Sequence, residues 1–176
     1  MTENLTCYCA KNRESPKCKF SIDIVSFIMK RFYMGYEWEP PQEFAEPILD
    51  SPLTPAIKNA AKQIFLNGRI EMHEAFEDAL CDDIQNAFFG DACDFVIEYS
   101  EVRNKPFDPK KFLQLCVILC SYGARSFNRG AEAAPIIAMS MICQTVQKLT
   151  MNGFFSEDSW LELDHFCENN YPKPAV

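Results

Sequence analysis

The sequence has few of the residues from which catalytic centres and phosphate-binding loops are built. Only 2 histidines and 6 glycines occur among 176 residues, and the chain has neither a glycine-rich phosphate loop nor a metal-binding His-Glu pair. His73 begins a polar-faced segment and His165 follows Asp164, so both are interpreted as surface or half-buried side chains rather than catalytic bases. We therefore predict no enzymatic activity and no metal or other cofactor.

An excess of basic residues and a long apolar run are also missing. The formal net charge is -8, which argues against a nucleic-acid binder because phosphate contacts need a basic surface. No apolar stretch approaches the ~20 residues that cross a bilayer, and residues 1–6 have neither the basic nor the apolar region of a secretory signal. We therefore expect a cytoplasmic protein.

Cysteine is abundant, with 9 residues, but without a secretory signal a reducing compartment and reduced thiols are expected. Cys7, Cys9 and Cys18 form the one cluster outside an apolar pattern, and no fourth ligand at the spacing of a zinc site lies nearby. The thiols that lie in apolar helical patterns, where cysteine acts as a small core residue, are Cys81, Cys93, Cys116, Cys120 and Cys143.

One stretch is apolar nearly all round. Within residues 112–119 only Gln114 is polar, so a helix here must be wrapped by other helices. Asp108 is its predicted N-cap and Pro109 a first-turn residue. The small pair Gly123-Ala124 would let a neighbouring helix approach closely. These features predict a buried central helix.

Amphipathic segments on either side are available to surround this helix. Ser21, Thr54 and Ser156 are the predicted N-caps of the first, second and last of them. Asn67-Gly68 is predicted to end the second. The expected helices cover residues 20–33, 54–67, 72–80, 108–128, 133–149 and 156–166, and a further one between 80 and 108 begins at residue 83 or 91 and ends at 102. No strand-like alternation occurs, so the predicted class is all-α, with an arm at 1–18, one domain at 19–168 and a tail at 169–176.

Four stretches occur in the order 24–32 with 35–38, 57–64, 116–124 and 152–163, and they resemble the homology segments of the Bcl-2 family of apoptosis regulators. Residues 24–32 with 35–38, which end in Gly-Tyr-Glu-Trp, are similar to the N-terminal segment of pro-survival members. The other three are residues 57–64 (homology segment three), 116–124 (part of segment one) and 152–163 (segment two). The resemblance implies a Bcl-2-like bundle of seven or eight helices around a buried central hydrophobic helix.

The resemblance also implies a function, the capture of an amphipathic helix in a hydrophobic groove. The expected protein is a pro-survival regulator of apoptosis that binds the homology-3 helices of pro-apoptotic Bcl-2 family proteins and no nucleic acid. Met72 and Phe76 are expected to be exposed on a groove wall, whereas Cys116 and Leu119 fit core packing at least as well. The full set of candidate groove residues is Ile64, Phe65, Met72, Phe76, Phe95, Val96, Tyr99, Lys111, Leu115, Cys116 and Leu119.

The chain departs from the family pattern at the start of the central helix. In the family, asparagine, tryptophan, glycine and arginine stand where this chain has Phe-Leu-Gln-Leu at residues 112–115. The family's arginine pairs with an aspartate of the bound helix. Lys110 or Lys111, one turn earlier, are the candidate substitutes, and Lys62 stands where the family's homology-3 helix has its aspartate.

Two other functions remain open with the same fold. The first is a pro-apoptotic effector that permeabilises membranes with the central helix and residues 133–149 as an inserted hairpin. The second is a virulence or scaffold protein with an unrelated partner, which the missing arginine favours. Recruitment to the mitochondrial outer membrane through partners, and the oligomeric state, are left open.

Overall fold

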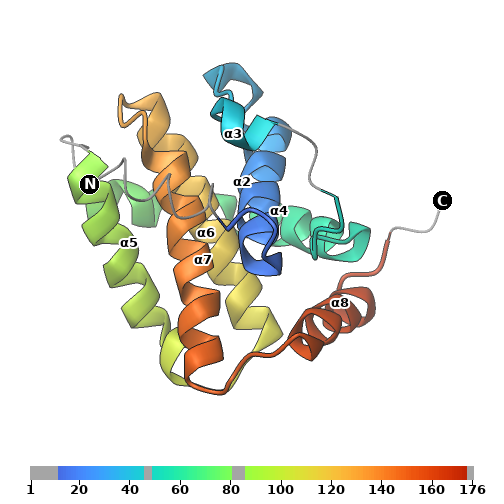
Figure 1. Cartoon of the computed structure of the whole chain (residues 1–176). Helices are drawn as coiled ribbons and strands as arrows, with labels where there is room; N and C mark the ends of the chain where they lie inside the picture. The colour runs from blue at the N-terminus through green and yellow to red at the C-terminus, as the bar shows by residue number, and fades with distance from the viewer. Residues whose placement is uncertain (1–11, 46–48, 81–85, 174–176) are drawn as a thin grey trace.

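The computed structural model describes residues 12–45, 49–80 and 86–173, and every regular element in these ranges is helical (Figure 1). The predicted all-α class is confirmed for this part of the chain. Single turns are formed by η1 (Met34–Tyr36), α3 (Gln42–Ala45) and η2 (Val102–Asn104). The longer helices are α2 (Pro16–Phe32), α4 (Pro55–Leu80), α5 (Asn86–Ser100), α6 (Pro109–Asn128), α7 (Ala134–Met151) and α8 (Asp158–Asn170).

Helix α6 is the central helix that the sequence predicts. It contacts α2, α4, α5, α7 and α8, and in Figure 1 it lies behind α7, between α5 and α2. Asp108 caps it as expected, because its carboxylate accepts a 3.1 Å hydrogen bond from the Lys111 N–H. Its apolar side chains from Phe112 to Leu119 are buried apart from Ile118, which is half-buried.

The structure has fewer helices than the seven or eight predicted. Among the described residues, six helices are longer than one turn, because the segments expected as a second and a third helix form the single helix α4. Asn67-Gly68 does not end this helix. Phe65, Met72 and Phe76 are all buried on the side that faces the core, so continuous packing outweighs the ~1 kcal/mol that a glycine costs inside a helix.

Of the three predicted N-caps besides Asp108, two are wrong and one is right. Helix α2 begins at Pro16, so residues 16–18 of the predicted arm are helical, and Ser21 lies inside the helix with its hydroxyl donating to the Lys17 carbonyl. Helix α8 begins at Asp158, and the Ser156 N–H donates to the Ser159 hydroxyl. Thr54 does cap α4, since its hydroxyl oxygen accepts from the Ile57 N–H at 3.3 Å. Residues 1–11 of the predicted arm lie outside the described residues.

The fourth predicted helix corresponds to α5, which runs without a break at Gly90. The alternative start at Asp83 lies outside the described ranges. The loop that follows contains the turn η2, where the Arg103 guanidinium donates a 3.2 Å hydrogen bond to the Thr145 hydroxyl of α7. This contact joins the loop that precedes α6 to α7, the helix that covers α6.

The predicted close approach at Gly123 is confirmed. A Cβ placed on Gly123 would lie 3.3 Å from the Cβ of Ala138 and 3.4 Å from the carbonyl oxygen of Ala134, both in α7. Glycine therefore lets the backbones of α6 and α7 pack closely over a buried interface.

Replacing Gly123 with leucine is expected to destabilise the fold by about 1–3 kcal/mol, because the added side chain must push α7 away from α6. Thermal and urea unfolding followed by circular dichroism measure the change. Gly90→Leu is the matched control, since a Cβ there meets nothing within 4 Å and leucine favours the helix. Equal stability of the two variants would contradict the close contact.

The cysteines of the described residues are buried. Cys93, Cys116 and Cys120 lie in the core as predicted, and desolvation raises the pKa of each thiol. Cys18, assigned by sequence to a cluster outside the core, is buried too, with its Sγ 3.3 Å from the Sγ of Cys143 in α7. Cys7, Cys9 and Cys81 lie outside the described residues.

Candidate functional site

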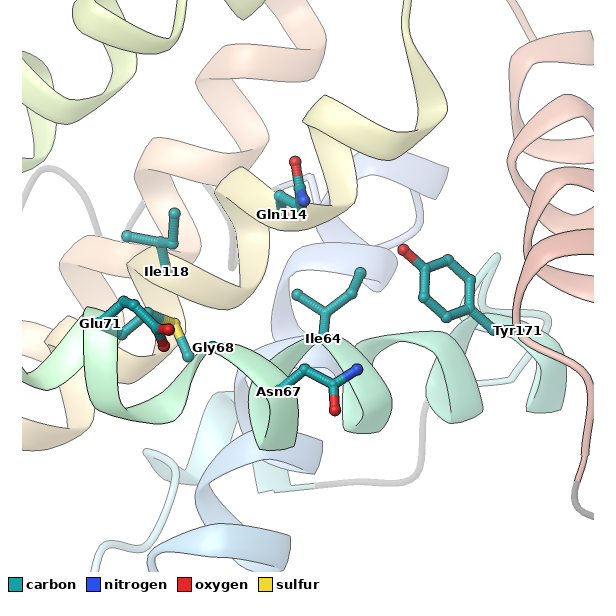
Figure 2. Close-up of a pocket in the computed structure, with 8 residues that line it drawn as sticks. Ile64, Asn67, Gly68, Glu71, Gln114, Ile118 and Tyr171 are labelled. Carbon is teal, nitrogen blue, oxygen red and sulfur yellow. The ribbon is translucent and has the colours of Figure 1, made fainter.

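A cleft of about 490 Å³ lies between α4 and α6 (Figure 2). We call it the α4–α6 cleft. One wall is one face of α4, the other is formed by Gln114 and Ile118 of α6, and the segment after α8 stands at one end. Its lining residues are Ile64, Asn67, Gly68, Glu71, Met72, Gln114, Ile118 and Tyr171.

Helical spacing places these residues on two facing walls. On α4 they recur every three or four positions from Ile64 to Met72, which is one face of a helix. Gln114 and Ile118 are four apart on α6 and share a face in the same way. At 1.5 Å per residue, the α4 wall is about 12 Å long from Ile64 to Met72. That length matches about two turns of a helix lying alongside it.

The end of the cleft at Tyr171 is held by hydrogen bonds from α4. The Asn59 amide donates to the Tyr171 carbonyl at 2.7 Å, and the Gln63 amide donates to the Pro172 carbonyl at 3.4 Å. These bonds keep residues 171–172, which belong to the predicted tail, against α4. Burial raises the pKa of the Tyr171 phenol, whose ring is directed toward the cleft in Figure 2.

The cleft has one charged lining residue, Glu71, whose side chain is exposed. Asn67, Gln114 and Tyr171 are neutral polar residues. Lys110 and Lys111, the candidate substitutes for the family's arginine, are exposed at the start of α6 and are not part of the lining. Among the described residues, no ion pair involves Glu71.

Two of the predicted groove residues, Ile64 and Met72, line the cleft. The expectation that Met72 and Phe76 are exposed is wrong, because Met72 is buried although it borders the cleft, and Phe76 is 0% exposed. The Phe76 ring packs edge-on against Tyr122 at 5.3 Å between ring centroids. Phe65 is also buried and stacks on Phe32 of α2 at 4.0 Å. The others that the structure places in the core are Leu115, Cys116 and Leu119.

The predicted residues on α5 lie apart from this lining. Phe95 and Tyr99 are 68% and 85% exposed, and their rings stack on each other with centroids 6.3 Å apart. Val96 beside them is half-buried against the core. Phe95 and Tyr99 therefore form a separate exposed region of α5.

Six lining residues were missed by sequence reasoning. Gln114 carried a usable signal, because a single polar residue in an otherwise apolar central helix marks the face that is left uncovered, and Ile118 lies one turn further along this face. Tyr171 carried none. The missed residues are Asn67, Gly68, Glu71, Gln114, Ile118 and Tyr171.

The two histidines lie on the surface. His73 is half-exposed, with its Nδ1 2.7 Å from an Arg125 nitrogen and 3.6 Å from Glu77. Arg129 also donates to Glu77, and this bond lowers the pKa of the carboxyl. The side chain of Arg129 also lies over the Phe76 ring at 5.1 Å. This group of charged residues fastens the C-terminal end of α6 to α4 and lies outside the cleft.

Within the part of the chain that the structure describes, no helix has the length and apolar character needed to cross a membrane. Comparison with known protein families, with curated proteins and with solved structures finds no match to this chain.

Proposed function

We propose that the chain is a Bcl-2-like regulator of apoptosis of the pro-survival kind, which binds an amphipathic helix in the α4–α6 cleft. The observation that carries the proposal is the cleft itself, open along the flank of a buried central helix and about two turns long. A ligand helix with apolar residues at positions i, i+3, i+4 and i+7 can place them between the Ile64 and Ile118 walls.

The sequence resemblance supports the choice of ligand. The homology-3-like segment, residues 57–64, lies in α4 and contributes Ile64 to one wall. The segment-one-like stretch, residues 116–124, lies in α6 and contributes Ile118 to the other wall. The proposed partners are pro-apoptotic Bcl-2 family proteins, bound through their homology-3 helices. The proposed location is the cytoplasm, with recruitment to the mitochondrial outer membrane through such partners.

The proposal is tested by titrating a panel of synthetic homology-3 peptides into the protein in a calorimeter. We expect at least one peptide to bind with a Kd of about 1 μM or tighter, the range in which helix burial outweighs the cost of ordering the peptide. The control is a peptide of the same composition in which the apolar spacing is scrambled. Absence of binding across the panel would contradict the proposal, and dye release from liposomes by the protein would instead support a membrane-permeabilising effector.

A further inference from the structure

The charge of the α4–α6 cleft restricts which helices it can accept. Glu71 is the one charged residue in the lining, its carboxylate is exposed, and no ion pair with another described residue neutralises it. The carboxylate is therefore available to a bound helix.

The lining residues of the opposite wall carry no positive charge. Gln114 and Ile118 of α6 are neutral, and Lys111 lies outside the lining. Tyr171, also uncharged, stands at the other end of the cleft from Glu71 in Figure 2. Within the lining, an acidic side chain of a ligand would meet the like charge of Glu71, and no lining residue carries a positive charge to pair with it. A lysine or arginine would meet an opposite charge.

We infer that the α4–α6 cleft selects amphipathic helices that carry a lysine or arginine at the edge of their apolar face, with Glu71 as the residue that determines this preference. The inference rests on the proposed function, because it names the ligand of the same cleft. It is the reverse of the arginine–aspartate pairing that the sequence resemblance implied. The ligand side chain is basic and the protein side chain is acidic.

The position of Glu71 gives the register of the basic residue. Glu71 follows Ile64 by seven positions on α4, which is about 10 Å along the helix axis. A ligand helix that lies along α4 has the same rise, so its basic residue is expected about two turns from the apolar residue that contacts Ile64. The net charge of -8 favours association with such a ligand as well, and this long-range contribution weakens with added salt.

The experiment uses three synthetic amphipathic peptides of about 18 residues, long enough to form five turns. They are identical except at one position, two turns from the central apolar residue, which is lysine, glutamine or glutamate. A second set carries the variable position two turns to the other side, so that either ligand orientation is covered. Each peptide is titrated into the full chain and into its Glu71→Gln and Glu71→Lys variants.

In one of the two sets, the lysine peptide is expected to bind about three- to fivefold more tightly than the glutamine peptide. The glutamate peptide is expected to bind more weakly than the glutamine peptide by a similar factor. These factors correspond to the energy of an exposed ion pair. Glu71→Gln should remove this preference and Glu71→Lys should reverse it. Glu132→Gln makes the same change in net charge at an exposed residue outside the lining, and it should leave the preference intact.

The outcomes separate this inference from the proposed function. Binding of all three peptides with equal affinity, unaffected by either Glu71 variant, would overturn the charge preference and leave helix capture standing. A preference that persists in Glu71→Gln would also overturn it, because the charge would then act from elsewhere. If no peptide of either set and no homology-3 peptide binds, the proposed function fails and the inference fails with it.

Discussion

Replacing Phe112 with alanine is expected to destabilise the protein by about 3–5 kcal/mol, the usual cost of removing a buried phenylalanine side chain. Phe112 is fully buried at the start of α6, with ring centroids 5.8 Å from Phe20 of α2 and 6.5 Å from Trp160 of α8. The same ring lies 5.6 Å from Phe107 and 6.2 Å from Phe155. Its removal would leave a cavity where three helices meet.

For a chain of this size the loss corresponds to a Tm lower by roughly 10 °C or more, measured by calorimetry or circular dichroism. Phe95→Ala removes the same side chain from a position that is 68% exposed, and we expect it to change stability by no more than about 0.5 kcal/mol. Similar losses in the two variants would show that the aromatic cluster around Phe112 does not hold α2, α6 and α8 together.

The second large effect concerns binding. Replacing Ile118 with glutamate is expected to weaken the binding of a homology-3 peptide by at least about tenfold. The substitution puts a charge where the ligand buries apolar side chains, and burying an unpaired charge is costly. Ile118 is half-buried in the cleft wall, so its side chain can turn toward water and the fold should survive. Calorimetric titration measures the affinity, and circular dichroism checks the fold of the variant.

Ile64→Glu tests the opposite wall independently and is expected to have the same effect. Leu161→Glu is the matched control, because Leu161 is 59% exposed on α8 and lies outside the cleft. Binding that is unchanged in both cleft variants would place the ligand elsewhere, with the exposed Phe95 and Tyr99 on α5 as the next surface to test. Phe76 is unsuitable for this experiment, because a charge at a fully buried position would unfold the chain.

The central helix could be predicted from the sequence because its signals are local. An N-cap at Asp108, a proline in the first turn and a run of apolar residues interrupted only by Gln114 specify a helix that other helices must cover over most of its surface. The close approach at Gly123 follows from the same stretch, since only a residue without a side chain permits it. These features do not depend on which neighbours cover the helix.

Helix boundaries could be predicted less well, because local signals compete with packing. Asn67-Gly68 has the composition of a helix end, yet α4 continues through it since the burial of Met72 and Phe76 favours one long helix. Ser21 has the chemistry of an N-cap but lies within α2, where its hydroxyl bonds to the Lys17 carbonyl instead. In both places the surrounding helices decided the outcome.

The sequence by itself determined the helical class, the identity of the central helix and the net negative charge. Composition does not depend on the fold, and capping and periodicity are properties of residues that are close in the sequence. Only the tertiary structure decided which apolar residues face a cleft. The pattern of an amphipathic helix shows which side is apolar and leaves open what covers it. Packing buried Phe65 and Phe76 and left Ile64, Ile118 and Glu71 in the lining of the α4–α6 cleft. Packing also brought Tyr171, from the far end of the chain, beside Asn59.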